Sequence, residues 1–133
     1  MSDLKTKLNI QAVGRVCVTV ADTDRAIDFY VETLGLEKVV DVPMGPGMRW
    51  VEVKLPAGKT TIALAPPPPG QEAGGADTGI ILDTSDLEAD HAALKAAGVD
   101  VDEEISRHGD PVPPMFWLRD PDRNSLIIVE PSS

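Results

Sequence analysis

Cysteine is nearly absent from this chain, because Cys17 is the only one among 133 residues. A lone cysteine excludes an internal disulfide and a zinc site built from paired cysteines. The first ten residues lack the apolar stretch of a secretion signal. No apolar run approaches the roughly 20 residues that a membrane span needs. We therefore expect a soluble cytoplasmic protein.

Basic residues are also scarce: 12 Lys and Arg face 22 Asp and Glu, which gives a net charge of −10. Such a field repels nucleic acid and anionic membranes, so neither is expected as a partner, and it attracts cationic ligands. Aromatic residues make up only 4% of the chain, against 42% hydrophobic and 26% charged residues. The last two values are typical of a folded globular protein, and the length fits one domain.

The two halves of the chain repeat one order of predicted elements. Each half opens with an apolar strand that leads into a capped helix, and a glycine, Gly35 or Gly98, ends the helix. Asp22 or Thr23 is the expected cap of the first helix, and Ser85 or Asp86 of the second. The predicted strands are 16–20, 36–42, 49–55 and 60–65 in the first half, and 78–84, 99–105, 112–119 and 125–130 in the second.

This duplication predicts an α+β fold of tandem βαβββ modules that form a curved mixed sheet around a cleft. The expected division is a leader over residues 1–11, a first module over 12–66, a Pro/Gly linker over 67–77 and a second module over 78–131. One helix covers one side of each set of four strands, so the positions that face it are apolar. The opposite faces are mixed in character, as expected for the wall of a cleft.

Two stretches, "VTVADTDRAIDFYVETLGLEKV" and "PPMFWLRDPDRNSLIIVE", carry a family resemblance. Over residues 12–131 the chain resembles the vicinal oxygen chelate superfamily, which includes glyoxalase I, fosfomycin-resistance thiol transferases, extradiol dioxygenases and bleomycin-resistance proteins. One departure is Arg123, which stands where the family's closing turn has glycine. Asn124 is expected to take the positive-φ position there, because asparagine tolerates that conformation.

The resemblance also locates four positions on the concave strands where the family's metal enzymes hold a divalent ion. Arg15, Ala63, Gly79 and Ile127 occupy them here. None of these side chains is a ligand for such an ion, so we expect no metal and no cofactor. Arg15 is expected either to pair with Asp83, or to meet an anionic or carbonyl group of a ligand, or to form a salt bridge with a neighbour at the surface.

The remaining candidate ligand-binding residues are few. Trp117 is expected to share a face with Met115 and Ile127 as an apolar stacking wall, whereas the alternation around Trp50 allows either face. Cys17 shares the face of Arg15, either as a nucleophile or as a small space-filling thiol. Of the two histidines, His91 is expected in solvent on its helix, and His108 lies in a loop as a contact, a base or an exposed residue.

Three functions remain open. The first is a metal-independent small-molecule-binding protein that resembles the bleomycin-resistance type, dimerises and sequesters a hydrophobic or cationic compound such as an antibiotic. The second is a metal-independent enzyme of lyase or isomerase type acting on a small carbonyl substrate, in which Arg15 stabilises an oxyanion and Asp83 or His108 carries the proton. The third is a non-catalytic interaction subunit.

Overall fold

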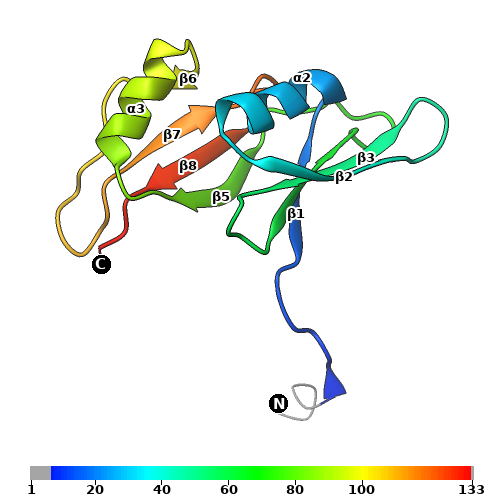
Figure 1. The fold of residues 1–133 in the computed structure, drawn as a ribbon, viewed down its shortest axis with the longest axis horizontal. Helices are drawn as coiled ribbons and strands as arrows, with labels where there is room; N and C mark the ends of the chain where they lie inside the picture. The colour runs from blue at the N-terminus through cyan, green and yellow to red at the C-terminus, as the bar shows by residue number, and fades with distance from the viewer. Residues whose placement is uncertain (1–6, 133) are drawn as a thin grey trace.

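The computed structural model describes residues 7–132, and these form two modules of four strands and one helical segment each (Figure 1). No helix in this range is long and apolar enough to cross a membrane. The first module contains β1 (Arg15–Thr19), α2 (Thr23–Ile27), the π-helical η1 (Asp28–Thr33), β2 (Glu37–Pro43), β3 (Arg49–Lys54) and β4 (Thr61–Ala65). The second contains β5 (Asp77–Asp83), α3 (Leu87–Ala96), β6 (Asp100–Val101), β7 (Met115–Arg119) and β8 (Ser125–Val129).

The two modules have the same sheet topology. The strand order is β1-β4-β3-β2 in the first sheet and β5-β8-β7-β6 in the second. In each sheet the first and last strands of the module pair in parallel, and the other pairs are antiparallel. The predicted tandem βαβββ fold is therefore confirmed, as two mixed sheets of four strands.

The helices begin and end where the sequence predicted. The Asp22 and Asp86 carboxylates accept hydrogen bonds from the backbone N–H groups of Arg25 and Ala89, so each aspartate is the cap. Gly35 and Gly98, which follow the helical segments, have φ of 82° and 80°. These left-handed conformations are open to glycine without steric cost.

The core lies on the helix-covered side of both sheets. Its largest fully buried side chains are Tyr30 in η1 and Phe116 in β7. Strand residues predicted to face the helices, such as Val18, Leu64 and Leu126, belong to the same buried cluster. One apolar cluster thus includes residues of both modules.

Three predictions about local structure are wrong. The strand predicted over 99–105 is confined to β6, because the Asp102 carboxylate accepts the Trp117 backbone N–H that a longer strand would pair. In the closing turn Arg123, with φ of 65°, takes the positive-φ position. His91 is half-buried rather than in solvent: its Nε2 donates to the Asp102 carbonyl oxygen at 2.7 Å, and its ring meets Phe116 edge-on at 4.9 Å.

Asn124 has a different role from the predicted one, because it is fully buried at the junction of the modules. Its side-chain amide donates to the Thr19 carbonyl oxygen at 3.0 Å. In the same turn Asp120 accepts from Tyr30 at 2.8 Å, and Asp122 forms an ion pair with Arg25 at 3.1 Å. The turn that closes the second module therefore holds the first module by hydrogen bonds.

Residues 7–14 form an arm that leaves β1 and extends away from both modules (Figure 1). The arm continues the direction of β1, because the Gly14 carbonyl still accepts the Thr61 N–H. Leu8, Ile10 and Val13 on this arm are exposed.

Candidate functional site

Each sheet has a second face that no helix of its own module covers, and we call it the helix-free face. On the first sheet, Cys17 pairs with Ala63, which in turn pairs with Glu52, so these three residues lie in one row. The alternation of strand residues places their neighbours two positions away on the same face. This face comprises Arg15, Cys17, Thr19, Trp50, Glu52, Thr61 and Ala63.

A polar cluster lies at the centre of this face, around Glu52. Thr61 Oγ1 donates to Glu52 Oε1 at 2.6 Å, and Trp50 Nε1 donates to Oε2 at 2.7 Å. Arg15 Nε lies 3.3 Å from the same Oε2. The Glu52 carboxylate is thereby surrounded by three donors from three strands.

These donors determine the charge state of Glu52. The hydrogen bonds from Thr61 and Trp50, together with the charge of Arg15, lower the pKa of Glu52 against the opposing effect of its burial. Glu52 therefore stays ionised at neutral pH. Only 9% of its side chain is exposed, whereas 60% of the Arg15 side chain is exposed.

Arg15 thus pairs with a neighbour at the surface, one of the predicted alternatives, and its partner is Glu52 rather than Asp83. Sequence reasoning did not select Glu52. Its signal was present in "RWVEVKL", where strand alternation places Trp50 and Glu52 on one face. What the sequence does not show is that Thr61 and Arg15, from β4 and β1, reach the same carboxylate.

Cys17 lies on the same face as Arg15, as predicted, and it is exposed. Partial desolvation raises the pKa of its thiol. A raised pKa keeps the sulfur protonated at neutral pH and disfavours nucleophilic reactivity.

On the second sheet, Trp117 pairs directly with Ile127, and Met115 pairs with Val129. Directly paired residues point to the same face, so the expected grouping of Trp117 with Met115 and Ile127 is present. Trp117 and Met115 are half-buried. Trp50 and Trp117 hence stand on the helix-free faces of different sheets.

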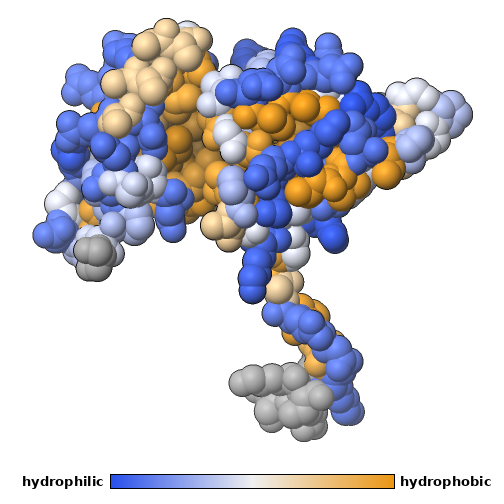
Figure 2. All heavy atoms as spheres, in the orientation of Figure 1, coloured by the Kyte–Doolittle hydropathy of each residue, from blue (hydrophilic) through white to orange (hydrophobic). Residues whose placement is uncertain are grey.

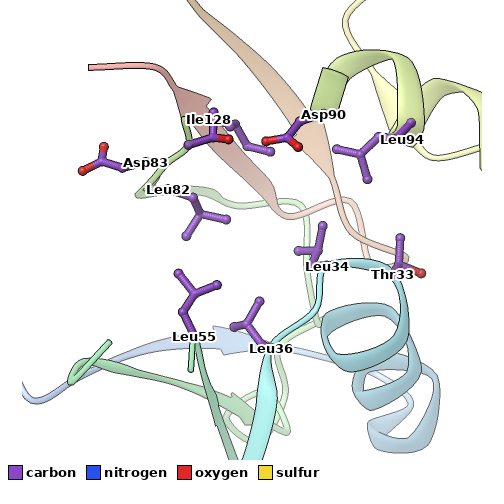
Figure 3. A pocket seen from close by; sticks show the side chains of 11 residues that line it. Thr33, Leu34, Leu36, Leu55, Leu82, Asp83, Asp90, Leu94 and Ile128 are labelled. Atoms are coloured by element: carbon purple, nitrogen blue, oxygen red, sulfur yellow. The ribbon is translucent and has the colours of Figure 1, made fainter. Parts of the chain in front are cut away.

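Two adjoining cavities of about 210 and 430 Å³ lie between the modules and share Leu36, Leu55 and Leu82; the larger one also reaches Gly79 and Ile81 of β5. Figure 2 shows hydrophobic atoms in the hollow between the modules. In Figure 3 the leucines converge on the first cavity, while the Asp83 carboxylate points away from them. We call these two cavities the inter-module groove. Asp83 therefore borders the groove, and the other five predicted ligand-binding residues do not line it.

The residues present do not fit a divalent metal ion. Arg15, Ala63, Gly79 and Ile127 offer no metal-binding atom, as the sequence showed. Within residues 7–132, no group of three or more His, Cys, Asp or Glu side chains is placed to hold a metal. The oxygens of Glu52, which pairs with Ala63 in the sheet, are engaged by Thr61, Trp50 and Arg15.

Residues 12–128 match the model of the Glyoxalase/Bleomycin resistance protein/Dioxygenase superfamily. Among solved structures, the chain is similar to TnmS3, an antibiotic-binding protein from Streptomyces sp. CB03234, with 34% identity, a TM-score of 0.80 and coverage of 94% of this chain and 99% of the other. A superfamily member from Sphaerobacter thermophilus DSM 20745 has 35% identity and a TM-score of 0.82, over 91% and 98%. The uncharacterized protein YetH of Bacillus subtilis (strain 168) is 28% identical over 91 residues, which are 68% of this chain and 76% of YetH.

Proposed function

Because this chain belongs to the Glyoxalase/Bleomycin resistance protein/Dioxygenase superfamily, we propose that it binds and sequesters a hydrophobic or cationic small molecule without a metal ion and without catalysis. One observation carries the proposal: each helix-free face presents a tryptophan, Trp50 or Trp117, that no helix of its module covers. Tryptophan supplies a large, flat surface for an apolar or planar ligand. The likeness to TnmS3, described as an antibiotic-binding protein, makes an antibiotic a reasonable ligand.

A metal-independent enzyme is supported less well by the geometry. A base or acid must lie within reach of the group that Arg15 would stabilise. Glu52 is the acidic group in contact with Arg15, and its lowered pKa makes it a poor proton carrier at neutral pH. Asp83 and His108 belong to the second module, and both are exposed.

We also propose that the protein acts as a homodimer. Within residues 7–132, the apolar side chains of the arm are exposed and the inter-module groove is open. The outer edges of β1 and β5 have no partner strand in this range. Large exposed apolar surface and open strand edges are features that assembly covers. Sedimentation velocity is expected to give twice the 14.2 kDa mass of the chain, and a mass of one chain at micromolar concentration contradicts the dimer.

The two tryptophans provide the test of binding. Each gives one indole N–H signal in a ¹H–¹⁵N spectrum, and Trp50→Phe and Trp117→Phe assign the two signals. Titration with tetraphenylphosphonium, a hydrophobic cation, and with naphthalene is expected to shift at least one signal saturably. Proton NMR of each compound after incubation is expected to show it unchanged. The absence of any shift, or conversion of the compound, would contradict the proposal.

A further inference from the structure

In the cluster around Glu52, the hydrogen-bond donors of Arg15 are more available to a ligand than the acceptor oxygens of Glu52. Glu52 Oε1 accepts from Thr61, and Oε2 accepts from Trp50 and contacts Arg15. With only 9% of its side chain exposed, Glu52 has little room for a ligand donor. The shortest contact of the Arg15 guanidinium with Glu52 is through Nε, and within residues 7–132 neither of its Nη atoms donates a hydrogen bond. The cluster therefore offers the Arg15 Nη donors to a ligand, whereas the Glu52 oxygens are nearly buried and already accept hydrogen bonds.

The positions of these donors are held by Glu52. The contact between Glu52 and Arg15 Nε restrains the Arg15 side chain. The hydrogen bond from Trp50 Nε1 to Glu52 fixes the orientation of the Trp50 ring. A guanidinium and an aromatic ring are thus oriented by one carboxylate on one face of the sheet. Pre-orientation of this kind lowers the entropy that binding would otherwise cost.

The charge of the cluster selects among possible acceptors. Glu52 is ionised, so it balances the charge of Arg15. The whole chain carries −10, which opposes the approach of an anion. A neutral carbonyl oxygen accepts hydrogen bonds from Arg15 without meeting that repulsion.

We infer that Glu52 is a positioning residue that holds Arg15 and Trp50 as a recognition pair for an uncharged, planar ligand with a carbonyl oxygen beside its ring. The inference rests on the proposed function, of which it specifies the hydrophobic ligand class. The planar part stacks on Trp50, and the carbonyl oxygen accepts from the Arg15 Nη groups.

Three probes of nearly equal shape test this inference on the full chain: acetophenone, a ketone; ethylbenzene, its hydrocarbon counterpart; and benzoate, its anionic counterpart. Dissociation constants come from the shift of the Trp50 indole signal. We expect acetophenone to bind about tenfold more tightly than either of the others, the factor that one hydrogen bond to a charged donor supplies.

Two variants separate the contributions of the pair. Arg15→Met is expected to reduce acetophenone affinity to that of ethylbenzene, because it removes the donors and keeps Glu52. Glu52→Gln is expected to favour benzoate over acetophenone, because it leaves the charge of Arg15 unbalanced. The control Arg107→Met removes an exposed arginine of the second module, which pairs with Glu88, and is expected to change none of the three constants.

Different results would overturn the inference and the proposed function. Equal binding of acetophenone and ethylbenzene, or an unchanged preference in Arg15→Met, would overturn the inference and leave the proposed function intact. If no probe shifts the signal of either tryptophan, both are overturned. Dispersed spectra of Arg15→Met establish that the variant is folded, so the inference does not depend on Glu52→Gln alone.

Discussion

The phenol oxygen of Tyr30 donates a 2.8 Å hydrogen bond to Asp120 Oδ2, and this bond joins the first module to the closing turn of the second. Tyr30 is fully buried, and Asp120 is buried as well. A buried hydrogen bond to a charged acceptor contributes more to stability than a neutral one.

Tyr30→Phe is therefore expected to lower the free energy of unfolding by about 1.5–3 kcal/mol, as measured by urea denaturation. A double-mutant cycle with Asp120→Asn isolates the contribution of the pair. The two substitutions are expected to be strongly non-additive. Additive effects would show that the bond does not hold the modules together.

Gly74 and Gly75 form a matched pair for a second prediction. Both have positive φ, of 82° and 71°, so alanine is strained at either position. A Cβ at Gly74 would also overlap the carbonyl oxygen of Asp122, whereas at Gly75 it meets open space. Gly74→Ala is expected to be the more destabilising by at least about 1 kcal/mol in urea denaturation. If Gly74→Ala and Gly75→Ala lose the same free energy of unfolding, the linker does not pack against the closing turn.

The lowered pKa of Glu52 predicts a pH dependence. A carboxylate whose pKa is lower in the folded state stabilises the fold above its ordinary pKa of 4.5, and this stabilisation is lost as the pH falls through the lowered value. The stability difference between the wild type and Glu52→Gln is therefore expected to be constant near pH 7 and to shrink below about pH 4.5. Urea denaturation between pH 3 and 7 measures it.

Glu88 provides the control for this pH series, because its ion pair with Arg107 is exposed. Exposed pairs contribute little to stability. Glu88→Gln is expected to differ little from the wild type in its free energy of unfolding at every pH. If the stability difference between the wild type and Glu52→Gln is equally independent of pH, the contacts assigned to the Glu52 carboxylate are contradicted.

The two histidines are expected to differ in their effect on stability. His91 donates to the Asp102 carbonyl oxygen and packs against Phe116, whereas His108 is exposed in a loop. His91→Ala is expected to cost about 1–2 kcal/mol of unfolding free energy, and His108→Ala less than about 0.5 kcal/mol. Thermal denaturation of both variants distinguishes them, and a reversed order would contradict the placement of His91.

Local chemistry explains why the sequence predicted the fold well. The caps at Asp22 and Asp86 and the glycines after each helix depend on neighbours in the chain. Strand alternation likewise placed Trp117 beside Met115 on one face. The misplaced features depend on distant groups: β6 ends where Asp102 binds Trp117, and Asn124 is buried against Thr19 of the other module.

The candidate site was only partly predictable for the same reason. Arg15 stands out because it occupies a position where the family's metal enzymes hold a ligand, and Trp50 because aromatic residues make up only 4% of the chain. Glu52 does not, because a glutamate on an exposed strand face is normally solvated. Its role depends on the parallel pairing of β1 with β4, which brings Arg15 and Thr61 to one carboxylate across 46 residues of chain.

The location of a bound probe tests the account most directly, because Trp50 does not line the inter-module groove. Intermolecular nuclear Overhauser effects between acetophenone and the protein report which surface the probe contacts. The account predicts contacts with the ring protons of Trp50. Contacts confined to the methyl groups of Leu36, Leu55 and Leu82 would place the ligand in the groove and contradict the account.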